Sequence, residues 1–180
     1  MPQITQSRRT EKPLVPIEMI SHGTLTSLDL QKSRRFYEEV LGLEVIQVST
    51  VSMLARKGTD HVYVIVETGE PSTMGMFDHN GIDVATREAV DEAHAVLTGN
   101  KSQYGLGRIT KPLDQHGAYS FYFADCDGNW WEIVHARPRG YASLYDDPAR
   151  DLTGRTDIDP DLFEHTGSDE YTETIRSQDG

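Results

Sequence analysis

The chain is poor in cysteine, in long apolar runs and in positive charge. Its 180 residues include one cysteine, Cys126, so no disulfide can form within the chain. A single thiol is typical of proteins kept in a reducing compartment, and we expect a cytoplasmic location. No apolar run approaches the roughly 20 residues that cross a bilayer. Residues 1–16, an N-terminal extension, lack the apolar centre of a secretory signal, so we expect no membrane partner.

Acidic residues outnumber basic ones, 29 to 17, and the formal net charge is -12. This excess disfavours nucleic acid as a partner. The charge is concentrated in an acidic C-terminal extension, residues 137–180, where positions 141–180 hold eleven Asp or Glu and three Arg. Two interpretations of this extension stay open. It is either a largely disordered acidic tail, or a segment whose aromatic residues pack over a neighbouring subunit or a site entrance.

Between the extensions, hydrophobic periodicity predicts the same order of elements twice, strand–helix–strand–strand–strand. The first module, residues 17–69, has strand patterns at 17–28, 43–49, 51–58 and 61–68, with a helix that starts near Asp29 and stops near Gly42. The second module, residues 79–136, has a helix at 88–99 and strand patterns at 79–86, 108–112, 118–124 and 130–136. Each copy opens with a histidine on its first strand, His22 and His79. We therefore predict an α+β fold.

The last hairpin, "FYFADCDGNWWEIVH" at residues 121–135, places a carboxylate inside an apolar strand. A five-residue turn at 125–129 would pair residue 124 with 130 and residue 122 with 132. Tyr122 and Glu132 would then be cross-strand neighbours on one face of the sheet. Cys126 is interpreted as a turn residue, because no base is evident beside it.

A buried carboxylate is costly unless it is protonated, paired or bound to a metal. Two imidazoles and one carboxylate on one side of a metal form the facial triad of non-haem Fe(II) enzymes. The repeat makes it plausible that both first strands present a histidine to one cleft. We therefore predict that His22, His79 and Glu132 are metal ligands, although spacing alone does not show that they converge.

Two motifs at the ends of residues 17–136 resemble those of the vicinal oxygen chelate superfamily, which includes glyoxalase I and type I extradiol dioxygenases. These are "HGTLTSLDLQKSRRFYEEVLGLEV" and "ADCDGNWWEIVH", the latter with Cys126 where the superfamily usually has proline. The resemblance implies two β-α-β-β-β modules that form a mixed, partly closed sheet around a metal cleft.

Within the superfamily, the chain is most similar to the single-domain extradiol ring-cleaving dioxygenases. Glu132 follows Tyr122 by the ten residues of their signature, whereas the interval from His116 to Tyr122 is shorter than usual. The similarity implies that His61 is the acid–base catalyst and that Tyr122 and His116 are hydrogen-bonding groups. It also implies Fe(II), alternatively Mn(II), as cofactor, a catechol and O2 as substrates, and a homo-oligomer.

Two other functions stay open at this point. One is a different metal-dependent reaction of the same superfamily, such as that of a thiol transferase, a lyase or an epimerase. The other is a non-catalytic protein that binds a drug or an aromatic metabolite, although such a protein needs none of the three metal ligands.

Overall fold

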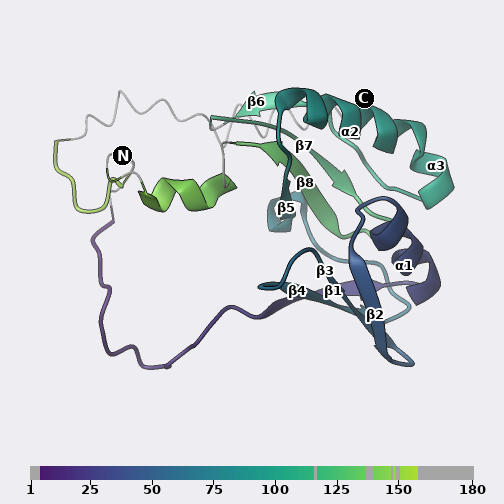
Figure 1. Ribbon diagram of the computed structural model, residues 1–180, viewed down its shortest axis with the longest axis horizontal. Coiled ribbons are helices and arrows are strands. Elements are labelled where there is room, and N and C mark those ends of the chain that lie inside the picture. The colour runs from purple at the N-terminus through teal and green to yellow at the C-terminus, as the bar shows by residue number, and fades with distance from the viewer. Residues whose placement is uncertain (1–4, 116, 137–139, 147, 149–150, 158–180) are drawn as a thin grey trace.

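The computed structural model describes residues 5–115, 117–136, 140–146, 148 and 151–157, and its helices and strands follow one another in two units (Figure 1). The first unit consists of β1 (His22–Ser27), α1 (Leu30–Glu39), β2 (Glu44–Ser49), β3 (Ser52–Arg56) and β4 (Val62–Glu67). The second consists of η1 (Met76–Asp78), β5 (Asn80–Asp83), α2 (Arg87–Gly99), α3 (Lys101–Tyr104), β6 (Leu113–Gln115), β7 (Ala118–Ala124), β8 (Trp130–His135) and η2 (Gly140–Asp146).

Each unit forms a four-stranded mixed sheet, and the two sheets have equivalent strand orders. The orders are β1-β4-β3-β2 and β5-β8-β7-β6. In each sheet the first strand pairs in parallel with the last strand of its unit, and the other pairings are antiparallel. The predicted α+β class is confirmed, and the strands form two separate four-stranded sheets (Figure 1).

The start of α1 follows directly from the sequence. Asp29 has an extended backbone, and its Oδ1 accepts hydrogen bonds from the backbone N–H groups of Gln31 and Lys32 at 2.9 and 3.1 Å. These bonds satisfy amide donors that have no partner within the helix, as at most well-capped helix starts. Phe36 and Tyr37 on this helix are fully buried.

The two units share one hydrophobic core. The ring of Phe36 lies 6.2 Å from that of Phe123 on β7, and the ring of Tyr37 lies 6.1 Å from that of Trp131 on β8. Tyr63 on β4 contacts the other side of this cluster, 5.3 Å from Trp131. Because side chains alternate along a strand, Glu132 points to the face of β8 opposite Trp131. The shared core thus fixes which face of the second sheet carries the carboxylate.

Three predicted strands differ from those in the structure. The strand predicted at 79–86 covers only Asn80–Asp83, so His79 directly precedes it. The first strand begins at His22 rather than at residue 17, since residues 17–21 run beyond the sheet. The strand predicted at 108–112 is reduced to a bridge between Ile109 and Phe123, and β6 instead covers Leu113–Gln115. Backbone hydrogen bonds still tie residues 107–110 to β7, at 2.9 Å from Gly107 and 2.8 Å from Thr110. The segment is therefore attached to the sheet without a regular ladder.

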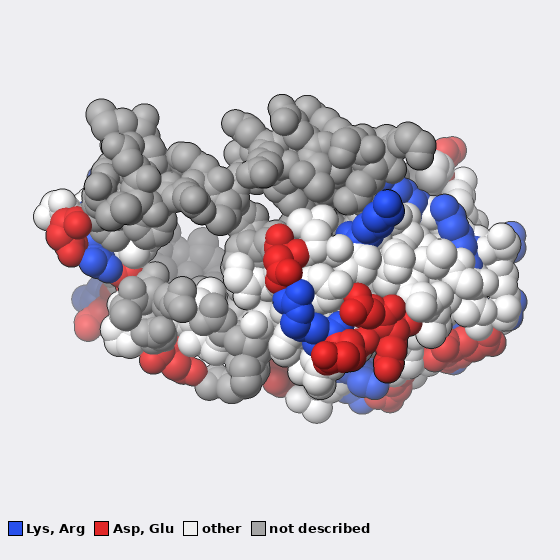
Figure 2. All heavy atoms as spheres, turned by 90° about the horizontal axis from the view of Figure 1, so that it is seen from above, with Lys and Arg blue, Asp and Glu red and all other residues white. Residues whose placement is uncertain are grey.

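Charged side chains of both signs are interleaved on the face seen from above in Figure 2. Ion pairs of the two units include Arg87 with Asp114 on the second unit and Arg56 with Glu44 on the first. Among the described residues, no helix has the length and apolarity needed to cross a bilayer.

Candidate functional site

The last hairpin has the register that the sequence predicts. Ala124 pairs with Trp130 and Tyr122 pairs with Glu132, on either side of the turn at 125–129. Glu132 is 4% exposed, so its carboxylate is buried on the face away from the shared core. Burial alone would raise the pKa of this carboxyl. Hydrogen bonds from three side chains outweigh burial and hold the pKa below its ordinary value, namely those of His79, Ser120 and Tyr122.

His79 lies opposite this carboxylate, between η1 and the start of β5. The parallel pairing of Gly81 with Glu132 brings the two strands together, and His79 Nε2 lies 3.5 Å from Glu132 Oε2. His79 Nδ1 lies 2.7 Å from the carbonyl oxygen of Met76. The hydrogen bond to Glu132 is the main reason that the pKa of His79 is raised, and burial opposes it.

The Met76 contact determines which nitrogen of His79 carries a proton. A carbonyl oxygen only accepts, so Nδ1 must be the donor. In the neutral ring, Nε2 is then a bare lone pair that faces a carboxylate oxygen. Two acceptors at this distance need a proton or a cation between them. A histidine whose Nδ1–H is held by a backbone carbonyl, with Nε2 free, is also the usual arrangement of a metal ligand.

Tyr122 completes this cluster. Its ring meets the imidazole of His79 edge to face, with centroids 4.8 Å apart, and the residue is 6% exposed. Tyr122 therefore contacts both members of the pair, as its cross-strand position predicts. Ser120, two residues earlier on β7, was given no role by the sequence; its position in phase with Tyr122 is the signal that could have assigned it one.

His22 lies on the other sheet. It is exposed at the first position of β1, where its Nδ1 is 2.7 Å from the hydroxyl of Ser21. Within the described residues, no three His, Cys, Asp or Glu side chains form a group that could hold a metal ion. One chain therefore brings together His79 and Glu132 of the predicted triad but not His22.

The predicted catalytic residue His61 also lies away from the pair. His61 directly precedes β4, and its ring packs against Tyr63 with centroids 4.9 Å apart. Tyr63 in turn contacts Trp131, so His61 lies on the core side of β8 and Glu132 on the other. His116 lies outside the described residues. The roles of both histidines stay predictions.

The closing turn serves a structural purpose that the sequence did not reveal. The Asp125 carboxylate accepts hydrogen bonds from Trp131 Nε1 at 3.0 Å and Tyr37 Oη at 3.2 Å. Asp127 accepts from the backbone N–H of Leu28 at 2.8 Å, in the β1–α1 connection. The turn therefore joins the second unit to the first and holds the hairpin that carries Tyr122 and Glu132.

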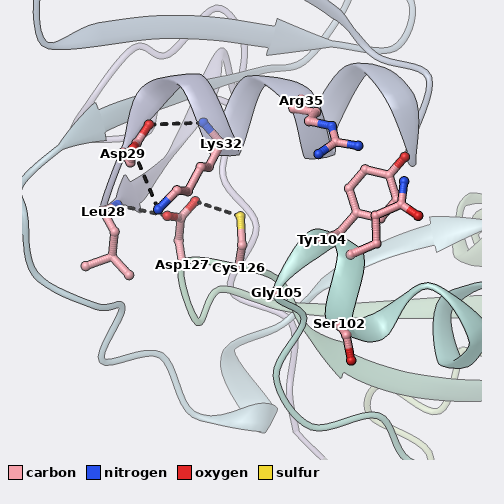
Figure 3. Close-up of a pocket in the computed structure, with 10 residues that line it drawn as sticks. Leu28, Asp29, Lys32, Arg35, Ser102, Tyr104, Gly105, Cys126 and Asp127 are labelled. Carbon is pink, nitrogen blue, oxygen red and sulfur yellow. Dashed lines mark hydrogen bonds and ion pairs between the residues drawn. The ribbon is translucent and has the colours of Figure 1, made fainter.

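A separate pocket of about 400 Å³ lies between α1, α3 and this turn, with Lys32, Arg35 and Tyr104 at its rim and Cys126 in its wall (Figure 3). Burial and the neighbouring carboxylates raise the pKa of the Cys126 thiol well above its ordinary value. The thiol therefore stays protonated at neutral pH and is a poor nucleophile. This finding agrees with its interpretation as a turn residue.

Comparison with known proteins gives a family match. The sequence profile of the Glyoxalase/Bleomycin resistance protein/Dioxygenase superfamily matches residues 19–133. None of the curated proteins matches the chain.

Solved structures with the same fold come from several bacteria. A family enzyme from Burkholderia phytofirmans PsJN has a TM-score of 0.55 at 19% identity, covering 67% of this chain and 100% of its own. One from Nocardioides has a TM-score of 0.53 at 21% identity, covering 70% and 88%. A fosfomycin resistance protein, FosX, from Listeria monocytogenes has a TM-score of 0.55 at 22% identity, covering 72% and 98%. That structure contains Mn(II) and a dihydroxypropylphosphonic acid. At these identities the likeness shows the fold.

Proposed function

Because the chain belongs to the Glyoxalase/Bleomycin resistance protein/Dioxygenase superfamily, we propose that it is a metal-dependent enzyme whose ligands are His22, His79 and Glu132. The observation that carries this proposal is the orientation of His79. Its Nδ1 is held by the Met76 carbonyl at 2.7 Å, and its Nε2 faces Glu132 at 3.5 Å. A divalent cation between Nε2 and the carboxylate would satisfy both acceptors at once.

The third ligand would come from a second copy of the chain. His22 is exposed at the edge strand β1 and lies on the sheet that does not contain His79 and Glu132. A pair of copies can bring β1 of one against the second sheet of the other, and a two-fold arrangement would then form two equivalent sites. The predicted homo-oligomer would therefore be a condition for activity.

As the reaction we propose extradiol cleavage of a catechol with O2, with Fe(II) as the metal and Mn(II) as the alternative. Both atoms of O2 enter the ring-opened product, so the reaction needs no further reductant. When bound, the metal would lower the pKa of the catechol hydroxyls and hold catechol and O2 side by side.

The protein's own groups would orient the substrate and move protons. We propose that Tyr122, buried beside the His79–Glu132 pair, donates a hydrogen bond to a substrate oxygen. We propose that His61 accepts a proton from the substrate and that His116 donates a hydrogen bond. A His61→Gln variant with full turnover would remove His61 from this mechanism.

The experiment is an oxygen-uptake assay. The protein is loaded with Fe(II) without air and then mixed with a panel of monocyclic, bicyclic and amino-acid-derived catechols in the presence of O2. A yellow ring-opened product with one O2 consumed per catechol supports the proposal, and Glu132→Gln should abolish both signals. If no catechol consumes O2 while the wild type binds the metal, the dioxygenase proposal is wrong.

The second candidate is another metal-dependent reaction, and the FosX structure with Mn(II) favours it. It predicts turnover that needs a divalent metal but no O2, for example addition of water or a thiol to an epoxide such as fosfomycin. A non-catalytic binding protein is the third candidate. It predicts that a Glu132→Ala variant keeps full affinity for the small molecule that the wild type binds.

A further inference from the structure

An apolar segment precedes β1 and packs on neither sheet. We call residues 13–20, with the sequence "PLVPIEMI", the arm. Every residue from Thr5 to His22 is exposed, and the large apolar side chains of the arm are each at least 61% exposed, namely Leu14, Val15, Ile17, Met19 and Ile20. In Figure 1 the arm is the purple trace that leaves β1 and runs clear of both sheets.

The arm has the properties of a docking segment. Pro13 and Pro16 favour an extended backbone, and Glu18 is its one charged side chain. Backbone hydrogen bonds hold the segment beyond each end, between Thr5 and Gly154 and between Ser21 and Val62. A concentration of exposed apolar side chains in one short segment marks a contact surface for a partner.

We propose that the arm docks on a second copy of this chain, where it packs against the exposed Phe77 beside that copy's His79–Glu132 pair. This inference rests on the proposed function, because it requires the pairing of copies that would complete the metal site. It goes further by assigning the arm to the pairing contact.

Continuity of the backbone supports a second copy of the chain as the docking partner. The arm ends two residues before His22, the proposed ligand that a single chain leaves apart from His79. If His22 reaches His79 and Glu132 of the second copy, the residues just before it must cross the surface around that site. The arm is therefore carried onto the second copy by the same movement that completes the ligand set.

The surface beside the pair offers a matching side chain. Phe77, in η1 two residues before His79, is 66% exposed. Aromatic side chains of this kind are enriched in the central part of protein interfaces, where aliphatic side chains pack against them.

Charge is complementary as well. Residues 8–12, directly before the arm, carry Arg8, Arg9 and Lys12 against Glu11, a net charge of +2 in a chain of -12. A second copy therefore carries the net charge opposite to that of this segment, which favours encounter of the two.

The test is a cross-link between two differently tagged populations of the full chain, both in a Cys126→Ser background. One carries Ile17→Cys and the other Phe77→Cys, and the control replaces Phe77→Cys by Val96→Cys, at a position on α2 that is 57% exposed. A short bismaleimide should join the Ile17→Cys and Phe77→Cys copies at least about tenfold more than the control pair, since docking raises the local thiol concentration. Equal yields would overturn the proposal.

A second test does not depend on the introduced cysteines, which could themselves disturb the protein. A variant that combines Leu14→Ser, Ile17→Ser and Met19→Ser changes only exposed side chains. Its association constant for pairing of two copies, measured by sedimentation, should be at least about tenfold lower, because the arm loses its apolar contacts. An unchanged association constant would contradict arm docking. Mn(II) binding, followed by electron paramagnetic resonance, separates the two proposals. A cross-linked pair without Mn(II) refutes the metal site alone, and an Mn(II)-binding pair without a cross-link refutes the arm alone.

Discussion

The hydroxyl of Ser33 on α1 donates a hydrogen bond of 2.6 Å to Asp127 Oδ2, across 94 residues of sequence. Asp127 is 2% exposed, and its other oxygen accepts from the backbone N–H of Leu28 at 2.8 Å. One carboxylate of the closing turn thus satisfies two donors of the first unit. The turn is a structural joint between the units as well as the connection of the hairpin.

Removal of this carboxylate should destabilise the whole chain. Asp127→Ala removes the acceptor of the Leu28 N–H, whereas the Ser33 hydroxyl can still donate to the Asp29 carbonyl oxygen at 2.9 Å. The expected loss in the free energy of unfolding is about 1–3 kcal/mol. Urea unfolding measures it. The control is Asp60→Ala, at an exposed position, which should change the free energy by no more than about 0.5 kcal/mol. Equal losses in both variants would show that Asp127 does not join the units.

The second carboxylate of the turn should make stability depend on pH. Burial raises the pKa of Asp125 to about 6, and hydrogen bonds from Trp131 and Asn129 offset only part of the effect. The folded state therefore keeps a proton that the unfolded chain releases near its ordinary pKa. Between about pH 4 and 6 this group should lower the free energy of unfolding as pH rises, by up to about 3 kcal/mol.

Asp125→Asn tests the sign, because an amide does not titrate. The free energy of unfolding of the wild type minus that of the variant should fall as pH rises from 4 to 6 and be flat above pH 7. The difference is the informative quantity, since carboxyls whose pKa is lowered, such as Asp114 beside Arg87, act in the opposite direction. A difference that is constant over this range would contradict the raised pKa of Asp125.

The sequence correctly predicted those features of the fold that depend on residues close to one another in the chain. The register that makes Tyr122 and Glu132 neighbours follows from turn length alone, and the start of α1 follows from the capping side chain of Asp29. The repeat also predicted the matching order of the two sheets. These features depend on interactions between residues that are close in sequence or directly opposite on paired strands.

Contacts between the units could not be predicted in this way. Nothing in the spacing of Asp127 and Ser33 indicates that they touch, because the contact depends on how α1 packs against β7 and β8. The alternation that predicted a strand from residue 17 is present in the sequence, but a strand needs a neighbour, and β1 meets β4 only from His22 onward. The same limit applies to His22 itself, whose place in a site depends on a second copy.

Ser120 is expected to be a positioning residue for the metal ligand. It is fully buried and hydrogen-bonds the Glu132 carboxylate. Ser120→Ala should weaken Mn(II) binding about tenfold, because groups that orient a ligand typically contribute that much. The control Ser52→Ala, on the other sheet, should leave the affinity unchanged. Electron paramagnetic resonance titration measures both, and equal affinities of the two variants would exclude a role for Ser120.

A mixing experiment decides whether the site is shared between two copies. His22→Ala and Glu132→Gln should each be inactive and should each bind Mn(II) weakly when alone. In a mixed pair, His22 of the Glu132→Gln copy meets the intact His79 and Glu132 of the other copy, so one of the two sites is complete. Random pairing of equal amounts makes half of the pairs mixed and should restore about a quarter of the wild-type sites.

The recovery should depend on exchange of subunits, so it should increase with time after mixing and reach its final value faster when the pair is diluted and reconcentrated. The matched control mixes two inactive variants, His79→Ala and Glu132→Gln, whose altered ligands would come from the same copy of the chain. They would share one complete site only if each ligand came from a different copy, whereas β5 and β8 pair within one chain. Recovery in the first mixture and none in the second is the expected result. If neither mixture recovers, all three ligands act within one chain or do not act together, and the shared metal site is wrong.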